Sequence, residues 1–151
     1  MENEEIRENS VPDILERYTQ DVMSLVPYLN YFEMHVNAQV SQTYNNSDIA
    51  HSMPFPVYDA TLMDFVKHAE NTKMIDRNYV YVYSRNRIQT PKDELMFIDD
   101  AEIKDMDDLA GILSKYIIEG RTKGGVWAQG VNNGVYYKLI SKMQELIKKW
   151  S

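Results

Sequence analysis

The longest helical period in the chain runs from Phe97 to Trp150, FIDDAEIKDMDDLAGILSKYIIEGRTKGGVWAQGVNNGVYYKLISKMQELIKKW. Apolar residues recur at helical spacing from Ile103 to Ile117, and the same period resumes from Val126 to Trp150. A glycine-rich turn at 119–125 separates the two segments. This spacing predicts two long amphipathic helices joined by a tight turn. Because neither helix can bury its apolar stripe alone, we expect the rest of the chain to cover this hairpin.

Further helices are expected upstream of this hairpin. The first begins at Ser10, which precedes a proline and an aspartate that both favour a first helical turn, and its apolar face continues to Leu25. Pro27 is expected to end that helix and to begin a second, short one. Asp59 is a typical N-cap residue, and it predicts a third helix that ends near Asn71.

Strands are expected between and after these helices. Tyr79–Tyr83, YVYVY, is the clearest strand signal, because every residue in it has a high strand preference and the two residue types alternate. An alternating pattern at 36–40, a proline-containing segment at 53–58 and an apolar run at 95–98 predict three shorter strands. Together these segments predict a small, mostly antiparallel sheet.

The predicted elements combine into an α+β fold in a single globular domain over residues 11–151. Four to five helices are expected to pack on a sheet of two to four strands, with the C-terminal helix–turn–helix hairpin as the core. Residues 1–10 are polar and are expected to form a flexible N-terminus. Trp150 falls on the apolar stripe of the last helix, so we expect it to anchor the C-terminus.

Composition excludes several classes of function. The formal net charge is -7 at pH 7, which disfavours binding to nucleic acids and to anionic membranes, since both rely on clustered lysine and arginine. There is no cysteine, which excludes disulfides and thiolate metal sites and fits a reducing compartment. The acidic N-terminus does not have the apolar segment of a secretory signal. We therefore expect a cytoplasmic protein that requires no cofactor.

Several features spread along residues 22–147 resemble a bacterial family known only as a domain of unknown function. The features in this chain that carry the resemblance are the aromatic segment 27–32, the segment 58–75, the helix 109–118, the turn Glu119-Gly120-Arg121, the segment 125–128, Gly134-Val135 and the final helix 139–146. Thr122 and Gly124 stand where the family is expected to have an aromatic residue and an acid. The resemblance implies one compact α+β domain and carries no known activity.

The turn Gly120–Trp127 is the strongest candidate for a binding site. Its glycines permit close approach of a ligand to the backbone, and the free N–H groups of the helix that follows attract anions. The predicted anion site consists of Arg121, Lys123, Gly124, Gly125 and Trp127. The alternative is a tight connector whose two cations neutralise nearby acids or the carbonyl end of the preceding helix.

No other group of residues predicts a catalytic or metal site. His35, His51 and His68 lack the spacing of a metal site, and the acid run at 99–108 lacks the glycine and glutamate positions of a calcium loop. Helix capping explains that acid run. The tyrosines of 79–83 are expected to be half covered by a helix.

Two functions therefore remain open. The first is a small acidic cytosolic protein, not an enzyme, that binds or regulates another protein, with a second copy of itself as one candidate partner. Its eleven tyrosines support this hypothesis, because tyrosine is favoured at binding surfaces. The second is a binder, or a hydrolase, of a small anionic ligand at the turn 120–127. A contiguous apolar patch would favour the first function, and a concave pocket beside Arg121 would favour the second.

Overall fold

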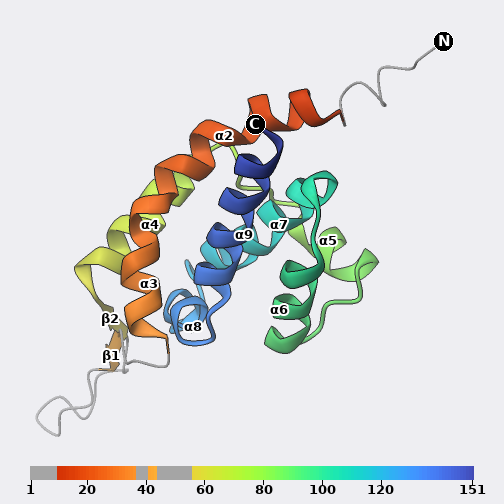
Figure 1. Ribbon diagram of the computed structural model, residues 1–151. Coiled ribbons are helices and arrows are strands. Elements are labelled where there is room, and N and C mark those ends of the chain that lie inside the picture. The colour runs from red at the N-terminus through yellow and green to blue at the C-terminus, as the bar shows by residue number, and fades with distance from the viewer. Residues whose placement is uncertain (1–9, 37–40, 44–55) are drawn as a thin grey trace, which may run out of the picture.

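The computed structural model describes residues 10–36, 41–43 and 56–151, and these residues form a bundle of helices gathered around α9 (Figure 1). The α-helices are α2 (Val11–Leu25), α3 (Leu29–His35), α4 (Ala60–Glu70), α5 (Tyr79–Arg85), α6 (Pro91–Asp100), α7 (Met106–Glu119), α8 (Val126–Asn132) and α9 (Val135–Trp150). Two 3-10 turns, η1 (Val26–Tyr28) and η3 (Ile103–Asp105), lead into α3 and α7.

The strands in the described part of the chain are short and lie at one edge of the bundle (Figure 1). β1 (Ser41–Thr43) pairs antiparallel with β2 (Pro56–Tyr58). The helices bury their apolar stripes against one another rather than against a sheet, so the predicted α+β fold is wrong. β2 falls within the predicted strand at 53–58, whereas the predicted strand at 36–40 lies outside the described residues except for Val36, the residue that follows the end of α3.

The segment predicted as the clearest strand is helix α5. In a helix, Tyr79 and Tyr83 stand one turn apart on the same side. Their hydroxyls donate hydrogen bonds to Glu119 over 2.9 Å and to Glu94 over 2.5 Å. Val82 faces inward and is 2% exposed. The tertiary partners of these side chains outweigh the local strand preference, which is a weak determinant by comparison.

The predicted strand at 95–98 is also wrong, because these residues lie inside helix α6. Thr90 caps this helix by accepting the backbone N–H of Asp93 over 3.1 Å, while the Asp93 carboxylate accepts the Thr90 N–H over 3.1 Å. Pro91 occupies the first helical turn. This reciprocal cap is a recognised helix start, and its residues are present in the sequence.

The helices predicted upstream of the hairpin are confirmed. Ser10 caps α2 by accepting the N–H of Asp13 over 3.4 Å, and the turn at Pro27 leads into α3 as expected. Asp59 precedes α4, but its carboxylate accepts the hydroxyl of Tyr31 over 2.8 Å instead of capping the helix. Asp59 thereby joins the start of α4 to α3.

The C-terminal hairpin is confirmed in its first helix and differs in its second. α8 ends at Asn132, and α9 begins after Gly134, whose φ is 80°. Glycine adopts this left-handed conformation at little steric cost, so it interrupts the helix predicted to be continuous. The side chain of Asn133 then accepts the N–H of Val135 over 2.9 Å at the start of α9.

Aromatic side chains fill the centre of the core. The ring centroid of Phe65 lies 4.8 Å from that of Phe32 and 4.9 Å from that of Tyr136, and Tyr136 lies 5.6 Å from Tyr116. A Cβ atom on Gly130 would stand 2.3 Å from the Tyr136 ring, so this ring packs directly on the backbone of α8. The contacts bring α3, α4, α7, α8 and α9 together around one aromatic cluster.

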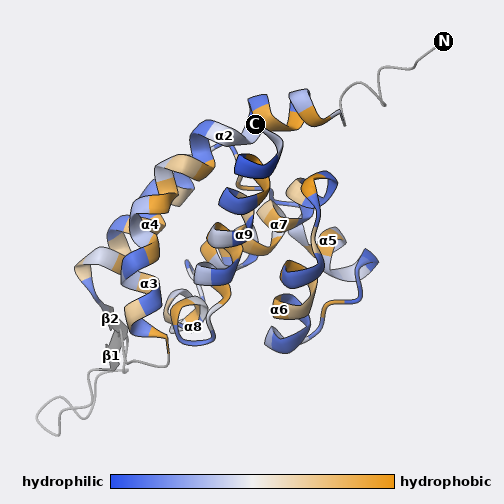
Figure 2. Cartoon of the chain, viewed as in Figure 1, coloured by the Kyte–Doolittle hydropathy of each residue, from blue (hydrophilic) through white to orange (hydrophobic). Residues whose placement is uncertain are grey.

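In most of the helices the side that faces the interior is apolar and the outer side is hydrophilic (Figure 2). Leu109, Tyr116, Leu139 and Met143, which lie on the apolar stripes of the hairpin predicted to be the core, are all exposed by 1% or less. Trp150 is 46% exposed, so the prediction that it anchors the C-terminus is wrong. Among the described helices, none combines the length and apolar character that crossing a membrane requires.

Candidate binding surface around helix α5

Both cations of the loop 120–127 are paired with acids. Nε of Arg121 lies 3.0 Å from the carboxylate of Glu70 on α4, and Nζ of Lys123 lies 3.5 Å from that of Glu119 at the end of α7. Each pair is partly exposed to solvent, so each is worth about 0–1 kcal/mol. This arrangement is the one that the connector alternative predicts.

The backbone and the tryptophan of the same loop are engaged as well. Gly125, with φ of 86°, donates its N–H to the hydroxyl of Tyr58 over 2.8 Å. Nε1 of Trp127 donates to the carbonyl of Ile117 over 3.0 Å, and Gly124 is exposed in the turn. The anion site at this loop stays a prediction, and its ligand has to displace the two acids that hold the cations.

The histidines and the acid run do not converge on a site in the described part of the chain. His35 contacts a carbonyl in the preceding helical turn over 2.7 Å, and His68 lies 3.4 Å from a tyrosine hydroxyl. His51 lies outside the described residues. Asp105 accepts the N–H of Glu102 over 2.8 Å, as a capping residue does. No group of three potential ligands able to hold a metal occurs among the described residues.

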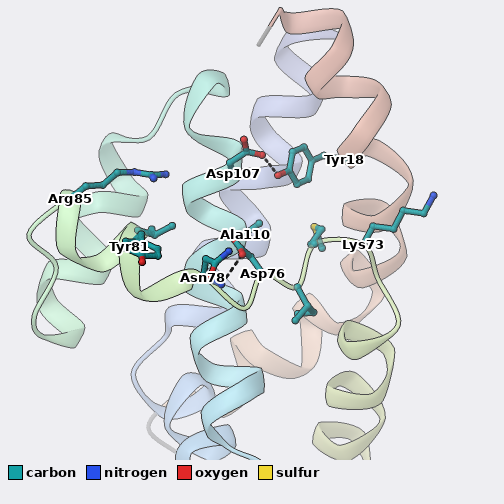
Figure 3. Close-up of a pocket in the computed structure, with 11 residues that line it drawn as sticks. Tyr18, Lys73, Asp76, Asn78, Tyr81, Arg85, Asp107 and Ala110 are labelled. Carbon is teal, nitrogen blue, oxygen red and sulfur yellow. Dashed lines mark hydrogen bonds between the residues drawn. The ribbon is translucent and has the colours of Figure 1, made fainter. Parts of the chain in front are cut away.

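A cleft of about 510 Å³ opens between α2, the segment that precedes α5, α5 itself and α7 (Figure 3). Three buried side chains, from Met74, Val82 and Ala110, contribute its apolar lining. The rest of the lining consists of the half-buried Ile75 and of the polar and aromatic residues Tyr18, Lys73, Asp76, Asn78, Tyr81, Arg85 and Asp107. Sequence reasoning missed this cleft, because its residues come from elements far apart in the chain.

Two acids at the start of α7 attach both walls of the cleft to the same helix end. Asp107 accepts hydrogen bonds from the hydroxyl of Tyr18 and, over 3.2 Å, from Arg17, both on α2. Asp108 forms an ion pair with Arg85 on α5. Burial, and next the hydrogen bond to Asp107, raise the pKa of Tyr18 well above its usual value. Tyr18 therefore stays a neutral hydrogen-bond donor at physiological pH.

The outer side of α5 is apolar and exposed. Val80 and Tyr81 are 60% and 68% exposed. Tyr81 borders the cleft of Figure 3, whereas Val80 borders a second hollow of about 360 Å³ on the other side of the helix. Ile88, a buried residue after the end of α5, contributes to the lining of that hollow. Helix α5 is thus a ridge with a hollow on each side, which we call the α5 ridge.

A buried glutamate holds the α5 ridge in place. Glu94 of α6 is 1% exposed, and it accepts the hydroxyls of Tyr83 from α5 and Tyr116 from α7 over 2.5 Å each. Nζ of Lys115 lies 3.4 Å from the same carboxylate. Burial first, and then the charge of Glu94, raise the pKa of Tyr83 and of Tyr116. No local spacing in the sequence indicates this contact.

The surface around α5 combines an apolar ridge with a cleft that has tyrosines and charged groups at its edge. Such a combination is suited to binding, because apolar contact provides affinity and a few polar groups provide orientation. Sequence reasoning did not predict this surface; the signal that could have indicated it is the YVYVY segment, since it has more apolar and aromatic residues than one face of a short helix can bury.

Comparison with known proteins gives a family without an activity. No curated protein and no solved structure matches the chain. A family described as a family of unknown function, DUF6508, matches residues 17–149. The match runs from α2 to the last residues of α9 and confirms the resemblance to a domain of unknown function. The chain therefore belongs to the family of unknown function DUF6508.

Proposed function

We propose that this protein is a non-enzymatic interaction protein that binds a partner protein across the α5 ridge. The observation that carries the proposal is the exposure of Val80 and Tyr81, at 60% and 68%, on a helix bordered by hollows on both sides. The absence of cysteine supports a cytoplasmic site of action.

The physical argument begins with the composition of α5. A helix that is apolar around its circumference is normally covered on all sides. Val82 is buried on the inner side of α5, whereas Val80 and Tyr81 are exposed to water. Burying these two side chains against a partner removes apolar area from solvent, which is worth roughly 1.5–3 kcal/mol for a fully buried side chain of this size. Tyrosine is also among the residues that dominate the energy of protein interfaces.

The contacts that hold α5 in place also support the proposal. Tyr79 and Tyr83 fix the helix through Glu119 and Glu94, so the ridge is held before a partner arrives. A preorganised surface loses less conformational entropy on binding than a mobile one. The fixed position of the ridge therefore favours recognition of one partner geometry.

The test is site-specific photo-crosslinking in the cells that express the protein. A photoreactive phenylalanine replaces Tyr81, and a matched control carries it at Met96 on α6, which is 55% exposed. We expect one defined protein to be crosslinked from position 81 and not from position 96. The second substitution Val80→Asp, which places a charge on the ridge, should abolish that product. Equal products from both positions, or products that Val80→Asp does not change, would overturn the proposal.

Self-association is measured in parallel, because the partner can be a second copy of this chain. Sedimentation velocity from about 1 to about 100 μM covers the affinity range of weak dimers. A dimer that Val80→Asp converts to monomer identifies the ridge as its interface. A monomer at all concentrations assigns the crosslinked product to a different protein.

A further inference from the structure

Asp76 carries a carboxylate in the cleft that no basic side chain neutralises among the described residues. It is half-buried, and its Oδ1 accepts the backbone N–H of Asn78 over 2.8 Å. None of the ion pairs among the described residues includes Asp76. Its charge is close enough to Tyr18 to contribute to the raised pKa of that hydroxyl. The cleft therefore contains, beside a tyrosine, a carboxylate that has no ion-pair partner among the described residues.

The other charged groups at the cleft are already engaged or directed elsewhere. Asp107 is paired with Arg17 over 3.2 Å, and Arg85 is paired with Asp108. Lys73 extends from the rim, and its ammonium points away from Asp76 (Figure 3). The net charge of -7 adds a long-range field that attracts cations to the molecule.

The walls of the cleft complement an organic cation. Tyr18 and Tyr81 both line it, one on α2 and one on the α5 ridge, and buried Val82 and Met74 contribute an apolar lining. Aromatic rings attract guanidinium and ammonium groups through their quadrupole, and an apolar lining suits the aliphatic stem of arginine or lysine. A carboxylate hydrogen-bonded to such a cation is one of the stronger polar contacts in proteins.

We propose that the cleft takes an arginine or lysine side chain of the partner protein, with its cation bound to Asp76 and its stem against Tyr81. This inference rests on the proposed function, because the partner lies across the same ridge. The partner segment is therefore basic at the point where it crosses from the α5 ridge into the cleft.

The probe for this inference is N-acetyl-argininamide, followed by amide NMR spectra of the full chain. We expect saturable shifts at Asp76, Asn78 and Tyr81, with a dissociation constant that is roughly millimolar for a single side chain. N-acetyl-citrullinamide has nearly the same shape without the charge and should give no saturable shift. N-acetyl-lysinamide tests whether an ammonium serves as well as a guanidinium.

The variant Asp76→Asn removes the charge and keeps an oxygen that can accept the Asn78 N–H. It should weaken binding of the arginine probe about tenfold, the factor expected for one charge-assisted contact. Asp100→Asn removes the same charge at an exposed position of α6 outside the cleft and should leave the affinity within about twofold. Equal shifts with the citrulline probe, shifts scattered over the surface, the same loss in both variants, or no saturation would overturn the inference.

The two proposals fail in distinguishable ways. Crosslinking from position 81 together with no arginine binding at Asp76 would support the interaction across the ridge and overturn the proposal that the cleft binds a basic side chain. Arginine binding at Asp76 without a crosslinked partner at position 81 would support the cation site and overturn the proposed interaction across the ridge.

Discussion

Gly120 leaves the space in which the indole of Trp127 lies. A Cβ atom at this position would stand 2.1 Å from Cδ1 of the ring. Gly120→Ala therefore has to move an indole that donates to the carbonyl of Ile117 over 3.0 Å. Overpacking of this kind costs roughly 1–3 kcal/mol, which we expect as a loss in the free energy of unfolding measured in urea. Thr122→Ala in the same exposed turn should change it by less than about 0.5 kcal/mol. Equal effects would show that the ring can move freely.

From the raised pKa of Tyr83 we predict that the protein loses stability at alkaline pH. This pKa is raised by burial, then by the charge of Glu94, so the folded state keeps the hydroxyl proton after the unfolded state has lost it. A raised tyrosine pKa gives stability that is present below the unfolded pKa of about 10 and is lost as the pH rises above it. Tyr83→Phe should therefore reduce the slope of unfolding free energy against pH between about 10 and 11, by up to about 1.4 kcal/mol per pH unit.

The control for this prediction is Tyr81→Phe on the same helix, since Tyr81 is 68% exposed. Urea unfolding of both variants at a series of pH values from about 8 to about 11 measures the two slopes. If Tyr83→Phe keeps the slope of the unmodified protein, the Tyr83 hydroxyl titrates as it does in the unfolded chain. The buried contact with Glu94 would then be absent in solution.

At the residue scale, the sequence could indicate the loop 120–127 but not its contacts. The glycines and cations are adjacent in the chain, so they are visible as a group. The partner of Arg121 is Glu70, which is far away in the chain, and only the packing of α4 beside α7 brings them together. Asp76 does not stand out as part of a group in the sequence, because the residues that line the cleft with it include residues of the helices α2, α5 and α7.

Val82 is the buried apolar side chain through which helix α5 packs against α7. A Cβ atom on Gly111 of α7 would stand 2.7 Å from the Val82 side chain, so the two helices meet closely at this point. Val82→Ala should cost about 1–3 kcal/mol and speed hydrogen exchange in α5 more than in α9. Val80→Ala, at an exposed position of the same helix, should cost less than about 0.5 kcal/mol. Similar exchange rates in both variants would mean that other contacts hold the helix.

The elements show where sequence reasoning succeeds and where it fails. α2, α7 and most of α9 could be predicted from a helical period of apolar residues longer than ten residues. A period of this length outweighs the secondary-structure preferences of single residues. α5 has seven residues, and its alternation of tyrosine and valine is a strand pattern. Its helical form depends on Glu94 and Glu119, which no local window contains. α6 was predictable from its Thr90–Asp93 cap, although the apolar run inside it suggests a strand.

On the scale of the whole molecule, one hydrophobic cluster joins α2 to α9. Its buried residues extend from Ile14 to Ile147 and include the aromatic centre. Helices that share a single core lose it together, so we expect one cooperative unfolding transition. The prediction of one domain over 11–151 depends on the same property, and it stays a prediction until unfolding is measured.

Leu139 of α9 provides the test of that cooperativity, because it is fully buried in the helix around which the other helices are gathered. Leu139→Ala should cost about 2–5 kcal/mol, whereas Lys148→Ala on the exposed side of α9 should have almost no effect. The background Trp150→Phe leaves Trp127 as the single tryptophan, so fluorescence reports on the contact between α8 and α7 while circular dichroism reports on all helices. Both signals should shift to lower urea together in Leu139→Ala. If the Trp127 signal changes first and the helical signal persists, the chain unfolds in parts, and the bundle does not have the single core that its buried residues indicate.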